Sequence, residues 1–249
     1  MSTFVLVHGA WHGGWCWEKL TPILEASGHR VVTPDLPGRG TESQPLSGLT
    51  LDDYADFLSF TLAAESEPVV LVGHSLGGAV ITQAAEFCPS DVGLLVYLAA
   101  YVPRDGESVA DWALSDVDSL LGKSMEVDWN QGLLRLDRAG SLECLYDDCS
   151  AQDRAQALQH LVDEPLAPVA QPLCLSGGGA AQLPAVYIEC LRDRTVSPAM
   201  QDRMQEQRSF REVQALDSGH SPFYSCPDEL AQLLEGSAKR LLGGRAHLM

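Results

Sequence analysis

A short apolar run that leads directly into a glycine-rich turn constrains this chain more than any other feature. Val69–Val72 has no polar side chain, as is typical of a central strand in a parallel sheet. The residues that follow are Gly73-His74-Ser75-Leu76-Gly77-Gly78, and a helical pattern of small residues begins at Leu76. A sharp turn from strand to helix needs small residues where the backbones approach, and the glycines supply that room. The segment therefore predicts a strained strand–turn–helix unit with Ser75 at its tip.

The rest of the chain alternates short β-branched runs with helical patterns, which indicates a parallel sheet covered by helices. Strands are predicted at Phe4–Val7, Arg30–Thr33, Pro68–Val72, Gly93–Ala99, Ala185–Cys190 and Glu212–Leu216. Helices are predicted at Trp17–Ala26, Leu51–Ala64, Leu76–Phe87, Pro198–Gln207 and Asp228–Leu242. From about residue 103 to 172 the alternation of strand and helix patterns stops. We therefore expect a cap inserted into a single α/β domain that spans residues 1–249.

Composition limits the partners and the compartment that we expect. The chain is 45% hydrophobic, enough for a sizeable core, and its formal net charge of −18 repels phosphate backbones and anionic lipids. No nucleic-acid or membrane partner is therefore expected. The apolar run Phe4–Val7 is too short to cross a bilayer and has no basic flank or cleavage site, which favours a cytoplasmic location.

The seven cysteines are scattered and form no C-x-x-C pair. The spacing of Cys144 and Cys149 has no second pair that would complete a zinc site. They are interpreted as reduced thiols, and no metal ion is expected.

Ser75 can act as a nucleophile at neutral pH only with a base beside it, held by a third group. In strand–turn–helix units of this kind the order along the chain is serine, acid, histidine. Among the histidines after Ser75, His160 lies in the cap and His247 lies near the C-terminus. His220, in the loop after Glu212–Leu216, is therefore the predicted base.

Two aspartates compete for the role of the acid. Asp193 lies in the loop after Ala185–Cys190, and Asp217 lies three residues before His220 on the same loop. Asp193 is favoured, because Asp217 is badly placed to point at the ring of its near neighbour.

An oxyanion hole needs two backbone N–H groups aimed at the developing negative charge. One is expected from Leu76, the residue after the nucleophile, and the other from Ala10 in the loop after the first strand. His8 and His12 in that loop have the side chains of a second base or of metal ligands. A structural role that braces the loop is the favoured interpretation.

The run from Phe4 to Trp17, F-V-L-V-H-G-A-W-H-G-G-W-C-W, resembles the opening of the plant methylesterase and hydroxynitrile lyase family. Bacterial esterases of the same α/β-hydrolase superfamily share this opening. The resemblance extends through Gly73–Gly78, Tyr187–Met200 and Gly219-His220. It implies an α/β-hydrolase fold, no cofactor, a triad of Ser75, Asp193 and His220, and oxyanion donors at Ala10 and Leu76.

Two departures from the family pattern favour its esterase branch. The hydroxynitrile lyases carry a threonine after the first histidine and a lysine directly after the catalytic histidine. In this chain those positions hold Gly9 and Ser221. Without an ammonium beside the base, nothing obvious stabilises a leaving cyanide anion, so the resemblance implies ester hydrolysis.

The expected activity is therefore hydrolysis of a small apolar or aromatic carboxylic ester through an acyl-enzyme. Residues expected to line an apolar pocket are Trp11, Leu76, Trp112, Trp129 and Phe223. Two alternatives stay open: a lyase or cyclase of natural-product biosynthesis on the same fold, and a ligand-binding receptor that retains the triad. The expected partner is a small-molecule ester, and assembly into a homodimer also stays open.

Overall fold

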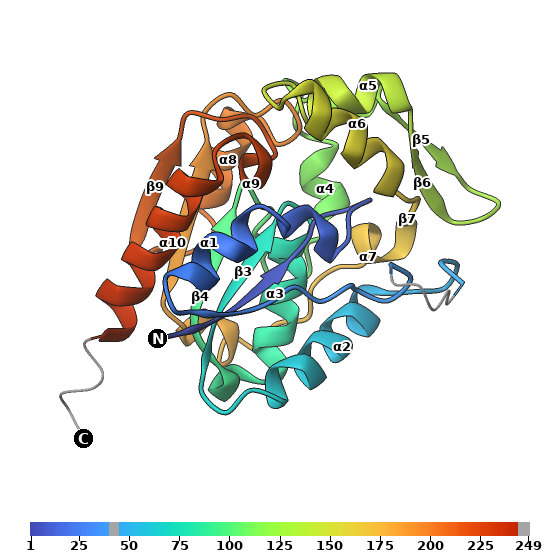
Figure 1. Cartoon of the computed structure of the whole chain (residues 1–249). Coiled ribbons are helices and arrows are strands. Elements are labelled where there is room, and N and C mark those ends of the chain that lie inside the picture. The colour runs from blue at the N-terminus through green and yellow to red at the C-terminus, as the bar shows by residue number, and fades with distance from the viewer. Residues whose placement is uncertain (40–44, 244–249) are drawn as a thin grey trace.

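The computed structural model describes residues 1–39 and 45–243, and its centre is a six-stranded sheet (Figure 1). The strands lie in the order β2-β1-β3-β4-β8-β9, and each neighbouring pair is parallel. Their bounds are β1 Thr3–Val7, β2 Arg30–Val32, β3 Val69–His74, β4 Val92–Leu98, β8 Ala185–Cys190 and β9 Glu212–Leu216. The predicted mostly parallel sheet flanked by helices is confirmed.

The helices that cover the sheet are α1 (Leu20–Ala26), α2 (Leu51–Ala63), α3 (Gly77–Phe87), α8 (Pro198–Gln205) and α10 (Pro227–Leu242). Alternate side chains of a strand point to opposite faces. On β1, Val5 and Val7 pack in the cluster formed with α2, α3 and α8. Phe4 and Leu6 point the other way, into the cluster formed with α1 and α10. Because both faces are buried, the central strands can be continuous apolar runs.

The helix predicted at Trp17–Ala26 begins later than expected. Gly14–Trp17 forms a 3₁₀ turn, and α1 starts only at Leu20. The physical reason is Pro22, which has no N–H to donate. The N–H groups in the first turn of a helix have no partner within the helix, so Pro22 costs nothing when the helix starts at Leu20. In a helix that began at Trp17, Pro22 would lie beyond the first turn and one hydrogen bond would be lost.

Residues 103–172, which we call the cap, contain a small sheet that the sequence pattern did not predict. β5 (Met125–Asp128), β6 (Leu133–Leu136) and β7 (Glu164–Pro165) pair antiparallel in that order. The helices of the cap are α4 (Val109–Ala113), α5 (Arg138–Cys144), α6 (Ala151–His160) and α7 (Leu166–Ala170). The Val162 N–H donates to the Trp11 carbonyl at 3.1 Å. The cap therefore contacts the loop that follows β1, at the carboxyl edge of the parallel sheet.

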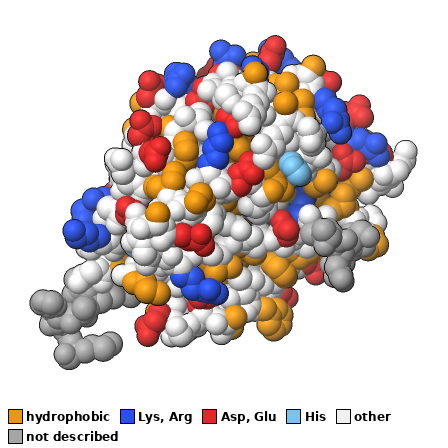
Figure 2. All heavy atoms as spheres, viewed as in Figure 1, with side chains coloured by type: hydrophobic (Ala, Val, Ile, Leu, Met, Phe, Trp, Pro, Cys, Tyr) orange, Lys and Arg blue, Asp and Glu red, His pale blue; other side chains and the backbone are white. Residues whose placement is uncertain are grey.

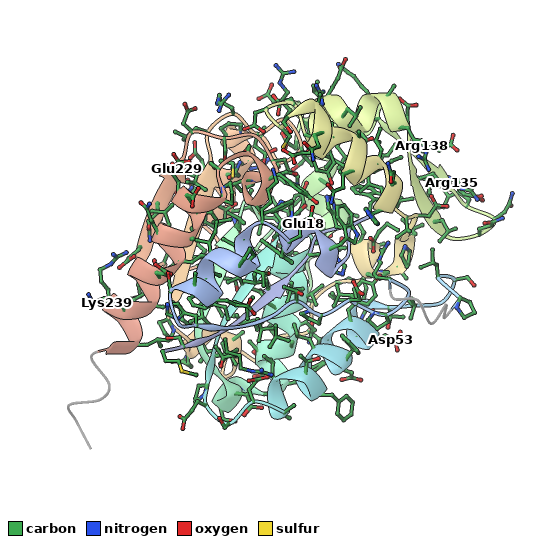
Figure 3. The ribbon with its side chains drawn as sticks, in the orientation of Figure 1. Glu18, Asp53, Arg135, Arg138, Glu229 and Lys239 are labelled. Atoms are coloured by element: carbon green, nitrogen blue, oxygen red, sulfur yellow. The ribbon has the colours of Figure 1, made fainter. Side chains whose placement is uncertain are left out.

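An exposed carboxylate also connects the cap to the rest of the chain. Glu18, labelled near the centre of Figure 3, follows the first 3₁₀ turn. It accepts hydrogen bonds from Nε2 of Gln156 in α6 at 2.7 Å and from the hydroxyl of Tyr224 at 2.9 Å. Tyr224 belongs to α9 (Pro222–Ser225), the short helix before α10.

The surface carries charges of both signs. Acidic and basic side chains alternate with apolar ones over the face shown in Figure 2. Arg135 and Arg138 lie at the outer edge of the cap (Figure 3), and Arg135 pairs with Asp128 at 3.0 Å. Within residues 1–39 and 45–243, no helix has both the length and the apolar character needed to cross a membrane.

Candidate active site

Ser75 lies in the sharp turn between β3 and α3 with a backbone φ of +53°. This left-handed conformation is strained for a residue with a Cβ, so neighbouring contacts must hold it. The Ser75 N–H donates to the Leu98 carbonyl at 3.2 Å, and its own carbonyl accepts from the N–H groups of Gly78 at 3.0 Å and Tyr101 at 3.2 Å. The turn is thus attached to β4 and the segment after it, and Ser75 keeps 7% of its surface exposed.

Three glycines permit the close backbone approaches around this turn. A Cβ on Gly73 would lie 2.4 Å from the Gly77 carbonyl oxygen, and one on Gly78 would lie 2.3 Å from the Tyr101 carbonyl oxygen. A Cβ on Gly77 would lie 2.8 Å from the carbonyl oxygen of Val7 in the neighbouring strand. No other residue fits these positions without moving backbone, because the nearest obstructing atom in each case belongs to the main chain.

His220 and Asp193 come together at the same edge of the sheet, although 27 residues separate them. Asp193 follows β8 and His220 follows β9, and the carboxyl ends of neighbouring parallel strands lie side by side. The His220 Nδ1 lies 2.7 Å from Oδ2 of Asp193. The other oxygen, Oδ1, accepts from the N–H groups of Thr195 at 2.7 Å and Val196 at 3.0 Å. These bonds fix the plane of the carboxylate against the imidazole.

The competing aspartate lies elsewhere. The Asp217 side chain is 81% exposed and accepts from Nε of Arg192 at 2.7 Å. A carboxylate so exposed is solvated and does not meet the His220 ring. Between the two candidates, the geometry favours Asp193.

His74, which the sequence analysis did not assign a role, connects the serine turn to His220. Its Nε2–H donates to the His220 carbonyl at 2.8 Å, and the two rings lie 4.5 Å apart. Burial lowers the pKa of His74 well below its usual value, and the neighbouring His220 and His12 lower it further. His74 is therefore neutral, and it positions the loop that carries His220. Its place directly before the serine was the only sequence signal for this role.

The backbone N–H groups of Ala10 and Leu76 are the two oxyanion donors that the sequence predicts. Neither donates a hydrogen bond to another residue in the described ranges. Leu76 directly follows Ser75, and the loop that holds Ala10 packs against the serine turn, since a Cβ on Gly9 would lie 2.9 Å from Cβ of Ser75. Both N–H groups thus belong to segments that meet at Ser75.

His8 and His12 hold the carbonyls of this loop. Nδ1–H of His8 donates to the Gly9 carbonyl at 2.8 Å, and Nδ1–H of His12 donates to the Ala10 carbonyl at 2.7 Å. Burial lowers the pKa of His8 to about 3 and that of His12 to about 4, so both rings are neutral at neutral pH. These contacts hold the loop carbonyls in place, which is the structural role favoured from the sequence. In the described ranges, no group of three or more His, Cys, Asp or Glu side chains has the geometry of a metal site.

The four aromatic residues predicted for a pocket lie in different surroundings. Phe223 is fully buried and packs edge-on against the His74 ring at 5.0 Å. Trp11 is also buried. Trp112 belongs to α4, and the guanidinium of Arg203 lies 4.9 Å from the centroid of its ring.

Trp129 lies far from the position expected of a pocket residue. Its side chain is 78% exposed in the turn between β5 and β6, so the structure does not bring it to the site. The hairpin turn carries this residue away from the packed layers.

Comparisons with known proteins cover almost the whole chain. The model of the alpha/beta hydrolase family matches residues 4–233. A carbendazim hydrolyzing esterase from Nocardioides sp. (strain SG-4G) is 34% identical over 249 aligned residues, which cover 94% of this chain and 98% of that protein. A putative chloroplastic methylesterase 11 from Arabidopsis thaliana is 32% identical over 93% of this chain, which spans only 62% of the length of that relative.

One relative that covers a similar share of the chain is named as a synthase and not as an esterase. Norfluorocurarine synthase 1 from Strychnos nux-vomica is 31% identical over 96% of both chains. Among solved structures, a pyrethroid hydrolase from Sphingobium faniae JZ-2 superposes with a TM-score of 0.88 at 28% identity, over 97% of this chain and 99% of that one. From the family match and these similarities, we conclude that the chain belongs to the α/β-hydrolase family, as a relative of the plant methylesterases and the bacterial esterases.

Proposed function

We propose that this protein hydrolyses carboxylic esters, with Ser75 as the nucleophile, His220 as the base and Asp193 as the acid. One observation carries the proposal: the paired His220 and Asp193 side chains lie at the sheet edge where Ser75 occupies a strained turn. Esterase and hydrolase names among the relatives support the same reaction.

In this mechanism, Nδ1–H of His220 donates to Asp193, which leaves the lone pair on Nε2 free to take the Ser75 proton. The serine Oγ attacks the ester carbonyl, and the oxyanion accepts from the N–H groups of Leu76 and Ala10. His220 then gives its proton to the leaving alcohol, and an acyl-enzyme remains. A water molecule, deprotonated by His220, attacks the acyl carbon and releases the acid and free Ser75.

The proposed substrate is a small apolar or aromatic ester. Relatives named as methylesterase and as carbendazim hydrolyzing esterase support a small-molecule ester as the substrate. After His220 the chain has Ser221, whose hydroxyl donates to the Leu145 carbonyl at 2.7 Å in a fully buried position. A hydroxyl committed to the backbone supplies no positive charge for a leaving anion, which supports hydrolysis over lyase chemistry.

The proposal is tested with p-nitrophenyl esters of increasing acyl length. The wild-type protein is expected to hydrolyse the short esters with saturation kinetics. Ser75→Ala should lose about 10⁴-fold or more in kcat, since removal of a triad nucleophile leaves only binding and the oxyanion hole. Ser90→Ala is the matched control, because Ser90 is exposed and its hydroxyl donates to the side chain of its neighbour Asp91. Absence of hydrolysis at every acyl length would contradict the proposal.

The relative named as a synthase makes a non-hydrolytic reaction the second candidate. That candidate would require His220 but not an acyl-serine. Turnover that survives Ser75→Ala and is abolished by His220→Ala would favour it. Equal loss in both variants favours the esterase.

A further inference from the structure

Trp11 is attached to the cap through three hydrogen bonds. Its N–H donates to Oε2 of Glu164 at 2.8 Å, and its indole N–H donates to the Leu134 carbonyl at 3.0 Å. Its carbonyl accepts from the N–H of Val162 at 3.1 Å. Trp11 has a φ of +63°, which a bulky residue adopts only with such support. The cap therefore holds the backbone one residue after Ala10.

The Glu164 carboxylate is in turn held by two side chains outside the cap. It forms an ion pair with Arg39, and each of the two side chains is 1% exposed. The Tyr54 hydroxyl on α2 donates to Oε1 at 3.2 Å. Arg39 also donates from Nη1 to the Asp163 carbonyl at 2.8 Å, next to Glu164 in the chain. Both carboxylate oxygens are thus partnered, and Oε2 is directed at the Trp11 N–H.

Stability alone is a weak reason for such a buried pair. Taking both charges out of water costs about as much as their attraction returns, and apolar side chains of similar volume often do as well. A charged acceptor, however, binds an N–H more strongly than a neutral one and fixes its direction. Burial raises the pKa of Glu164, and the Arg39 charge and the Trp11 N–H act against that increase. The ion pair therefore favours the charged form of Glu164, whose Oε2 accepts from the Trp11 N–H.

We infer that Glu164 is a positioning residue for the oxyanion hole, acting through the Ala10–Trp11 peptide on the N–H of Ala10. The inference rests on the esterase function proposed above. Fixing the Trp11 N–H fixes the peptide plane that follows Ala10, and the brace from His12 holds the carbonyl of that same peptide. The Ala10 N–H lies in the preceding peptide, whose Gly9 carbonyl accepts from His8. The two peptides meet at Cα of Ala10, so a displacement of the second one shifts the Ala10 N–H. Through Arg39, the loop after β2 and strand β7 of the cap are coupled to the orientation of the oxyanion donor.

The test compares two double variants that both remove the buried charges. Arg39→Met with Glu164→Gln keeps an acceptor oxygen for the Trp11 N–H, and Arg39→Met with Glu164→Leu removes it. Neither leaves an unpaired buried charge. The measurements are kcat and KM on p-nitrophenyl acetate and the rate at which a fluorophosphonate modifies Ser75, since its phosphoryl oxygen occupies the same hole. Near-UV circular dichroism checks that both variants fold.

We expect the leucine variant to lose about 10- to 100-fold in kcat relative to the glutamine variant, because a misplaced donor loses most of its effect. KM should change little, and phosphonylation should slow in parallel. Equal kcat and phosphonylation in the two variants, or a change in KM alone, would overturn the inference.

Two further outcomes are informative. If neither double variant folds, Tyr54→Phe decides the question: kcat falls severalfold if Glu164 positions the loop and is unchanged if it does not. If the wild-type protein neither cleaves esters nor reacts with the fluorophosphonate, the proposed function itself fails and the inference falls with it.

Discussion

Asp193 Oδ2 lies 2.7 Å from His220 Nδ1, and both side chains are excluded from solvent, at 0% and 1% exposure. In the mechanism proposed above, a carboxylate in this position fixes the tautomer of the imidazole and stabilises the imidazolium that forms when Ser75 gives up its proton. The two N–H groups on its other oxygen keep the carboxylate oriented in the resting protein.

Asp193→Asn should therefore lower kcat by about 10⁴-fold while the protein stays folded, because an amide at this position can favour the wrong tautomer. Asp217→Asn is the matched control, since its side chain is exposed and contacts Arg192. Steady-state kinetics on p-nitrophenyl acetate measure both. A large loss in Asp217→Asn with Asp193→Asn still active would reverse the assignment of the acid.

Gly9→Ala should lower kcat sharply through a shift of the loop backbone. The new Cβ would lie 2.9 Å from Cβ of Ser75 and 3.1 Å from Nδ1 of His74, so the loop or the serine must move. A displacement of about 1 Å costs about 100-fold in kcat. Gly122→Ala is the control, because nothing lies within 4 Å of its Cβ. Retention of full activity in Gly9→Ala would show that the loop is not packed against the serine.

His74→Leu should separate the role of His74 from simple core packing. The variant fills the buried position with an apolar side chain but leaves the His220 carbonyl without its donor, at a cost of about 1–3 kcal/mol in the free energy of unfolding. We expect about a tenfold lower kcat, measured beside urea unfolding curves. His160→Leu, at the exposed end of α6, serves as the control. Lower stability with unchanged kcat would limit His74 to a structural role.

The buried histidines predict loss of stability on mild acidification. The pKa of His12 is about 4 in the folded state, against about 6.5 in an unfolded chain. Between these values the unfolded state binds more protons, so the contribution of His12 is fully present above pH 6.5 and is lost as pH falls.

For each such histidine the free energy of unfolding should fall by about 1.4 kcal/mol per pH unit below pH 6. Urea unfolding at pH 7, 6 and 5 gives the slope for the wild-type protein. His12→Gln should reduce that slope by about the value for one proton, and an unchanged slope would show that His12 does not titrate in this way.

The sequence by itself was enough for the features that depend on neighbouring residues. Short β-branched runs between helical patterns predicted the six strands of the parallel sheet, two of them with the observed bounds, at Ala185–Cys190 and Glu212–Leu216. The glycines around Ser75 predicted the sharp turn, because the steric limits of a turn act over a few adjacent residues. The late start of α1 at Leu20 was also encoded locally, by Pro22, but the hydrophobic spacing from Trp17 concealed it.

The cap shows where local patterns fail. Its strands have two to four residues, which is too short for an alternation of side chains to appear. The aromatic character of Trp129 suggested a pocket, yet its exposure depends on where the hairpin turn lies relative to the other layers.

Only the tertiary structure decided which distant groups meet. Asp217 is nearer to His220 in sequence, but Asp193 reaches its ring because β8 and β9 are adjacent and end at the same edge. Glu164 and Arg39 are 125 residues apart, and no local sequence pattern predicts that they pair. The run of residues determines the conformations that each segment can adopt. The packing of the sheet and the cap determines which side chains share a buried volume. The chemistry of the site depends on this packing, because it brings together groups that are distant in the sequence.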